Sequence, residues 1–164
     1  MILYRLMHWR PFFPLGLATF ALSCIVSTST ANAAAPSFES ELIFPPERFH
    51  NHSPSIVQTP KGHLLACWFH GQGERKDNSL VILASRKKKS ADKWSEPFVL
   101  ADNKSLPDQN PTLFIDPQKR LWLFWISSLD NEVRGHFLKY RISTDYEADG
   151  PPKWNWQDSL IEDR

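Results

Sequence analysis

The residues with the clearest chemical potential lie in the stretch HGQGERKDN, which covers residues 70 to 78. Glu74, Arg75 and Asp77 follow two glycines there, within four positions of one another. A carboxyl group can transfer a proton in catalysis, and the planar guanidinium group of arginine binds the two oxygens of a carboxylate or phosphate. The same residue types are also typical of a solvated turn between two strands. The local sequence leaves both interpretations open.

Two histidines, His50 and His52, form a second candidate group upstream of this stretch. Residues i and i+2 of a strand project from the same face, which could bring both imidazoles to a metal ion. The sequence offers no apparent third ligand, and pairs of this kind are usually incidental. We therefore expect no metal site and no cofactor.

The first 33 residues have the pattern of a secretory signal peptide. They contain Arg5 and Arg10 but no acidic residue, then the apolar run LGLATFALSCIV, then a small-residue site ending at Ala33. The apolar run is shorter than the about 20 residues that a spanning helix needs, so we expect no stable membrane span. The segment before Cys24 lacks the leucine usual in lipoprotein signals. Export to the periplasm or the exterior, with cleavage near Ala33, is therefore the expected localisation.

The composition is that of an exported globular protein. Lys and Arg number 19 against 18 Asp and Glu, which argues against a nucleic-acid partner because such partners require a clustered positive surface. Only Cys67 follows the signal segment, so no internal disulfide is possible. The basic run RKKKS, from Arg86 to Ser90, is interpreted as a solvated loop. Five tryptophans are expected in the core: Trp68, Trp94, Trp122, Trp125 and Trp154.

Short β-type runs separated by turn residues dominate the chain after residue 49, and prolines recur between them. No long window keeps the i, i+3, i+4 spacing of an amphipathic helix. The runs are PSIVQT, HLLACWF, SLVILAS, EPFVLA, PTLFID, RLWLFWI, FLKYRIS and DSLI. The sequence therefore predicts an all-β fold.

An internal repeat defines the architecture more closely. The segment SPSIVQTPKGHLLACWF, residues 53–69, aligns without gaps on NPTLFIDPQKRLWLFWI, residues 110–126, at an offset of 57 residues. Each copy continues with a strand end, a polar loop and a tryptophan. Four-stranded units of this length are the blades of β-propellers, and the continuous apolar strands fit burial on both faces. We predict a lead-in over 34–48, blade 1 over 49–106 and blade 2 over 107–164.

Two blades are fewer than the four to eight that close a propeller, and they would expose large apolar faces. A truncated gene product or a fragment is the expected explanation. Self-association through the exposed blade faces is the less favoured alternative.

The stretch from Phe49 to Asp158 resembles the sialidase (neuraminidase) superfamily, whose propellers carry BNR or Asp-box repeats. The opening-blade pattern SPSIVQTPKGHLLACWF, the second-blade pattern NPTLFIDPQKRLWLFW and the loops that end in tryptophan carry this resemblance. The loop STDYEADGPPKW is a stretched version of the Asp-box pattern S-x-D-x-G-x-T-W, whereas SRKKKSADKW keeps little more than its serine and tryptophan. The resemblance implies a six-bladed β-propeller, here truncated to about two blades.

The resemblance also implies an activity and a site. Sialidases use a tyrosine paired with a glutamate as nucleophile, unlike most glycoside hydrolases. By position in the family pattern, Asp77 would be the catalytic acid/base. Arg75 would bind the substrate carboxylate, with Glu74 beside it. Complete relatives would remove terminal acidic sugars from glycans, so the implied partner is a glycan or sialoglycoconjugate.

The chain departs from the family pattern at one position of this site. Where the family has an arginine in an R-I-P segment, this sequence has His52-Ser53-Pro54, so His52 becomes the candidate for hydrogen bonding to substrate. Asp108 falls where the loops of the top face of the propeller converge in the family and is a further substrate-binding candidate. The tyrosine nucleophile and its glutamate belong to later blades, so we expect this chain alone to be inactive. The alternative is a non-catalytic glycan-binding or structural propeller remnant from a truncated gene.

Overall fold

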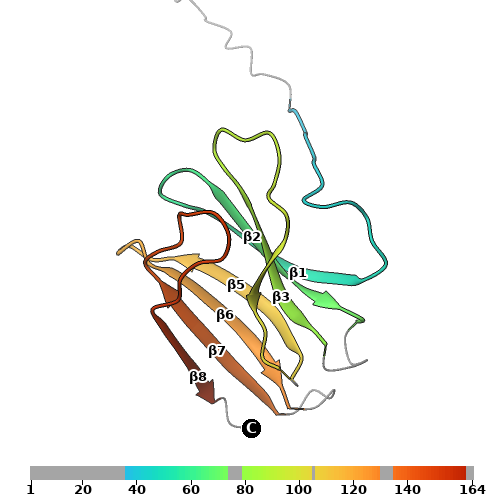
Figure 1. Cartoon of the computed structure of the whole chain (residues 1–164), viewed down its shortest axis with the longest axis vertical. Coiled ribbons are helices and arrows are strands. Elements are labelled where there is room, and N and C mark those ends of the chain that lie inside the picture. Colours follow the sequence, from blue (N-terminus) through green and yellow to red (C-terminus); the bar gives the residue numbers. More distant parts are fainter. Residues whose placement is uncertain (1–35, 74–78, 105, 130–134, 162–164) are drawn as a thin grey trace, which may run out of the picture. The chain divides into compact units, whose positions relative to one another are not determined.

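The computed structural model describes residues 36–73, 79–104, 106–129 and 135–161, and for residues 156–161 it describes the backbone only (Figure 1). The chain divides into two units, Met1–Glu39 and Ser40–Arg164, and the described strands all belong to the second. The described ranges contain no helix, and therefore none that could cross a membrane.

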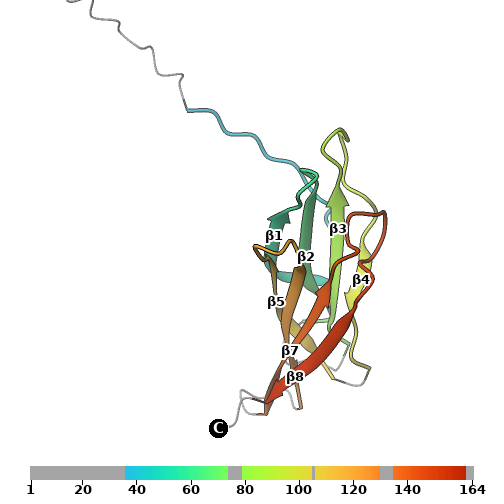
Figure 2. The same ribbon diagram turned by 90° about the vertical axis from the view of Figure 1, so that its left-hand side faces the viewer.

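In the described ranges eight strands form two antiparallel sheets, and each sheet is a meander in which consecutive strands are neighbours (Figures 1 and 2). The first sheet has the order β1-β2-β3-β4 and the second the order β5-β6-β7-β8. This architecture confirms the all-β class and the two four-stranded propeller blades. The strand bounds are β1 His50–Gln58, β2 Leu64–Gly71, β3 Val81–Lys87, β4 Phe98–Ala101, β5 Asp108–Ile115, β6 Leu121–Ser128, β7 His136–Ser143 and β8 Trp156–Ile161.

The two blades share the same strand register, as the sequence repeat predicts. Ile56 pairs with Ala66 in blade 1, and Leu113 pairs with Leu123 in blade 2, at the same 57-residue offset. The pairing shifts at equivalent places in both blades, where Ser53 and Asn110 each have a φ of 50°. Strands β1 and β5 therefore begin earlier than the prolines suggest, because a bulge lets the strand continue past Pro54 and Pro111.

The turn after the first strand of each blade is also built alike. In blade 1 the hydroxyl of Thr59 accepts a hydrogen bond from the amide of His63 at 3.2 Å. In blade 2 a carboxylate oxygen of Asp116 accepts the equivalent bond from Arg120 at 2.8 Å. Burial alone would raise the pKa of Asp116, but hydrogen bonds from Trp122 and Arg120 outweigh it and lower the pKa to about 2.

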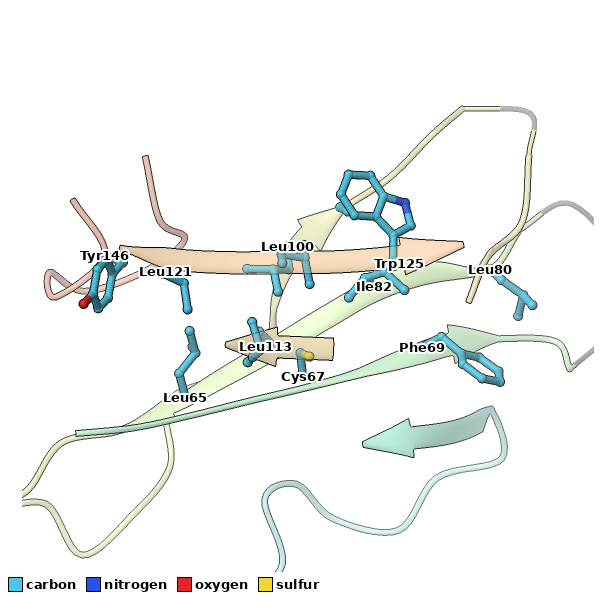
Figure 3. Packing of buried hydrophobic residues seen from close by; sticks show 13 residues of the cluster. Leu65, Cys67, Phe69, Leu80, Ile82, Leu100, Leu113, Leu121, Trp125 and Tyr146 are labelled. Carbon is cyan, nitrogen blue, oxygen red and sulfur yellow. The ribbon is translucent and has the colours of Figure 1, made fainter. Parts of the chain in front are cut away.

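The hydrophobic core fills the space between the two sheets (Figure 3). Blade 1 contributes side chains from β2, β3, β4 and the residue just before β3, and blade 2 contributes side chains from β5, β6 and the loop after β7. The members are Leu65, Cys67, Phe69, Leu80, Ile82, Ala84, Leu100, Ala101, Leu113, Leu121, Leu123, Trp125 and Tyr146. One blade therefore serves as the cover for the apolar face of the other.

Repeat-equivalent residues of the two blades differ in exposure: a position that is buried in one blade is exposed in the other. Leu113 is buried against blade 1, but its repeat equivalent Ile56 is 56% exposed. Phe114 is 51% exposed, whereas its equivalent Val57 packs against the core. This inversion follows from the repeat, because each blade has two apolar faces and the neighbouring blade covers only one of them.

The tryptophans divide between the core and these outer faces. Trp125 lies in the core and Trp154 packs against it, as expected. Trp68 instead stacks on Phe44 of the lead-in at 4.9 Å, and Trp122 stacks on Phe124 at 5.7 Å on the outer face of blade 2. The expectation that all five tryptophans fill the core between the blades was therefore wrong. Alternation along a strand sends neighbouring apolar residues to opposite faces.

The repeat-equivalent turn positions Gly62 and Lys119 allow a test of what a left-handed backbone conformation costs in stability. Both have left-handed backbone conformations, with φ of 82° and 62°, which cost a non-glycine residue about 1 kcal/mol. We expect Lys119→Gly to stabilise the protein by about 0.5–1 kcal/mol, measured as the free energy of unfolding in urea. Gly62→Ala should destabilise it, because the new Cβ would also lie 3.0 Å from Cδ of Lys89. Equal stability of both variants and the parent chain would contradict this.

Candidate functional site

Two of the sequence-predicted residues, His52 and Asp108, lie at one end of the blades, where β1 and β5 begin. Because the strands alternate in direction, β2 and β6 end there, and β3 and β7 start there. The register shows this directly: His50 pairs with Gly71, and Ser128 pairs with His136. We call this end, with its strand termini and connections, the site end.

Three predicted residues, Glu74, Arg75 and Asp77, lie outside the described residues. In the sequence they fall between the end of β2 at Gly71 and the start of β3 at Val81. Their roles remain predictions.

His52 is exposed at the site end and is linked to the neighbouring blade. Its Nδ1 lies 3.2 Å from the hydroxyl of Ser53, which in turn donates to the side-chain oxygen of Asn110 at 2.9 Å. Ser53 and Asn110 are repeat equivalents, so the same position in two adjacent blades makes this contact. The result is a short polar connection between the first strands of the two blades.

The imidazoles of His50 and His52 stack at 5.4 Å, in agreement with their predicted position on one strand face. Each ring also lies 5.5 Å from the ring of Phe69. The Nε2 atom of His50 is buried without a hydrogen-bond partner among the described residues. No three His, Cys, Asp or Glu side chains gather into a metal site within the described ranges.

A second polar group at the site end was missed by sequence reasoning. The ring Nδ1 of His70 lies 2.9 Å from the side-chain oxygen of Asn51 and 3.2 Å from a carboxylate oxygen of Glu47. The Asn51 amide also donates to Glu47 at 2.9 Å. The sequence repeat could have identified this group, because Asn51 aligns with the predicted site residue Asp108 of blade 2 and His70 aligns with Ser127.

Asp108 is fully buried, and its carboxylate accepts hydrogen bonds from its own blade and from the loop that precedes β5. One carboxylate oxygen accepts hydrogen bonds from the indole of Trp125, at 2.9 Å, and from the hydroxyl of Ser127. The other accepts from the backbone amide of Asn103 at 2.6 Å. Burial raises the pKa of the Asp108 carboxyl, and the three hydrogen bonds act in the opposite direction.

Asp108 also joins the two blades, because its own backbone amide donates to the carbonyl of Leu80 at 2.9 Å. These contacts give Asp108 a structural role at the junction of the blades. Its role in substrate binding remains a prediction, and the structure brings the exposed His52 and Asn110 to the surface instead.

The fold and the site end define a class: an all-β protein made of propeller blades that gather their polar residues at one end. Residues 62–163 match the family model described as a BNR repeat-like domain. The chain belongs to this family, within the sialidase/BNR repeat superfamily. No curated protein matches the sequence significantly.

The structural role of Asp108 can be tested by Asp108→Asn. An amide group has one oxygen to accept hydrogen bonds, so at least one of the buried donors around this side chain would lose its acceptor, at a cost of about 1–3 kcal/mol. The measurement is the free energy of unfolding in urea. The exposed neighbour Asp102 offers a matched control, and Asp102→Asn should change stability by less than about 0.5 kcal/mol. If the two variants were equally stable, the structural assignment would be wrong.

Proposed function

We propose that this chain is an exported, carbohydrate-directed domain of the sialidase type, and that its site end binds a terminal acidic sugar. The observation that carries the proposal is the position of His52. This exposed side chain lies at the end of blade 1 where β2 ends, and Arg75 and Asp77 follow β2 in the sequence. Membership of the BNR repeat-like family supports it.

The chemistry of the proposed residues is complementary. The guanidinium group of Arg75 can bind a sugar carboxylate through two parallel hydrogen bonds. His52 can donate or accept a hydrogen bond to a hydroxyl, since a neutral imidazole has one nitrogen of each kind. Asp77 would protonate the leaving glycosidic oxygen. A neighbouring arginine lowers the pKa of an aspartate, so such a role requires that burial by bound substrate counteract the effect.

Binding and hydrolysis make different demands on this chain. A sialidase reaction also requires a tyrosine nucleophile activated by a glutamate, and the family pattern assigns these to later blades. Blades 1 and 2 provide the part of such a site that recognises the carboxylate and supplies the acid. We therefore propose that the chain binds the sugar but does not turn it over alone.

Two further proposals concern the setting of this domain. The basic start, short apolar run and small-residue site of residues 1–33 support export with cleavage near Ala33. The exposed apolar side chains on the outer blade faces, Ile56 and Phe114, support self-association, because a neighbouring copy would remove them from water.

The sugar-binding proposal predicts that the full chain binds N-acetylneuraminic acid, detected by saturation-transfer NMR. Arg75→Gln should weaken this binding by at least about tenfold, because charge-assisted hydrogen bonds to the carboxylate are lost. The adjacent Lys76→Gln removes the same charge and serves as the matched control, with little expected effect. Absence of binding by the parent chain would favour the structural-remnant alternative. Hydrolysis of a fluorogenic sialoside that is abolished by Asp77→Asn would overturn the proposal that the chain alone is inactive.

Self-association predicts that sedimentation velocity will show species larger than the monomer at micromolar concentrations. Phe114→Lys places a charge on the outer face of blade 2 and should shift the population towards the monomer. Gln118→Lys adds the same charge at an exposed turn residue and should leave the distribution unchanged. A parent chain that remains monomeric across the concentration range would contradict self-association.

A further inference from the structure

We propose a second binding site for an acidic sugar, in a cavity between the two blades at the end opposite the site end. The cavity has a volume of about 280 Å³. It is formed by the β3–β4 connection of blade 1 and the β7–β8 connection of blade 2, which lie at the same end of the molecule (Figure 1). The lining residues that carry the proposal are Arg86, Lys88, Lys93, Trp94, Asp149 and Gly150.

The first observation is the burial of Arg86. Arg86 is only 3% exposed, yet neither its Nε nor its Nη1 has a hydrogen-bond partner among the described residues. The remaining nitrogen, Nη2, donates to the carbonyl of Gly150 over a long 3.4 Å. Buried cations are normally paired and hydrogen-bonded, because removing a charge from water is costly. Arg86 therefore lacks the anionic partner that such a position usually contains.

The nearby carboxylates are occupied by other donors. Glu147 and Asp149 are the acidic groups that act electrostatically on Arg86. The oxygens of Glu147 accept hydrogen bonds from the hydroxyl of Thr59 at 2.7 Å and the amide of Lys61 at 3.1 Å. Asp149 forms an ion pair with Lys88 at 2.8 Å. An anion from outside the chain would supply the missing partner.

The second observation is the composition of the cavity wall. Lys88 and Lys93 add two cationic side chains to Arg86, against one carboxylate, so the lining is positive overall. Trp94 contributes an aromatic surface, and its indole nitrogen donates a hydrogen bond to a carboxylate oxygen of Glu41 at 3.1 Å. An aromatic face beside cationic groups suits a ligand that has both an apolar ring face and a negative charge. A uronic acid, a sugar ring carrying one carboxylate, has this combination.

The cavity also changes the interpretation of the RKKKS run. Lys88, Lys89 and Ser90 are exposed, in agreement with a solvated loop, but Arg86 is not. Strand β3 extends to Lys87, so Arg86 still belongs to the sheet and is directed between the blades. The run therefore begins with a buried cation and continues as the rim of the cavity.

The experiment is titration of the full chain with glucuronate, followed by NMR or calorimetry, with glucose as the neutral probe. We expect glucuronate to bind and glucose not to bind. Arg86→Met should abolish glucuronate binding without unfolding the protein, because replacing a buried unpaired cation by an apolar side chain is often neutral or stabilising. Lys93→Gln, an exposed change, should weaken binding by about three- to tenfold, whereas Lys104→Gln in the β4–β5 connection should have no effect.

The outcomes separate this site from the one at the site end. Binding that persists in Arg75→Gln but is lost in Arg86→Met supports the proposal. Binding that is lost in Arg75→Gln and retained in Arg86→Met overturns it, since the sugar would then occupy the site end. Inorganic sulfate that competes as well as glucuronate would overturn the assignment of a sugar, as would equal affinity for glucose.

Discussion

The rest of the structure depends on one constraint, the need to bury strands that are apolar on both faces. Strands β2 and β6 carry large side chains in both directions, so neither sheet can stand alone in water. Each blade meets this need by packing against the next, and the core between them contains residues from β2 to β6. Hydrogen bonds between β1 and β5 then align the two blades. The hydroxyl of Ser55 accepts a hydrogen bond from the amide of Leu113 at 2.9 Å, and the hydroxyl of Ser53 donates one to Asn110. Such bonds matter because the first strands have one edge that β-pairing does not cover.

The repeat shows how one backbone supports different chemistry at equivalent positions. Thr59 and Asp116 support the same turn with a hydroxyl and a carboxylate. Asn51 and His70 are partly exposed and interact with each other and with Glu47, whereas their repeat equivalents Asp108 and Ser127 are buried. The difference arises from position in the stack. Asp108 and Ser127 meet their hydrogen bonds with protein groups, and residues on the open side can meet solvent or a ligand.

The two ends of the blades have distinct characters. The site end presents histidines and amides, among them His52, Asn51 and Asn110. The opposite end presents lysines around a cavity, with Arg86 buried behind them. Both ends consist of connections between strands, where sequence can vary without disturbing the core. The two proposed binding surfaces therefore concern opposite ends of the same blades.

Much of this fold was predictable from the sequence, because strands, turns and the 57-residue offset depend on residues close together or on a repeated pattern. The turn positions Gly62 and Lys119 and the pairing of His50 with His52 follow from such local rules. Tertiary structure alone decided which face of each strand is covered, since Leu113 and Ile56 have the same pattern but opposite exposure. It also decided that Asp108 and Arg86 are buried, because Asp108 lies against Trp125 and Ser127 of the adjacent strand and Arg86 lies against the β7–β8 connection of the other blade. By itself, the sequence determined the blades and their family; contacts between blades determined which charged groups water can reach.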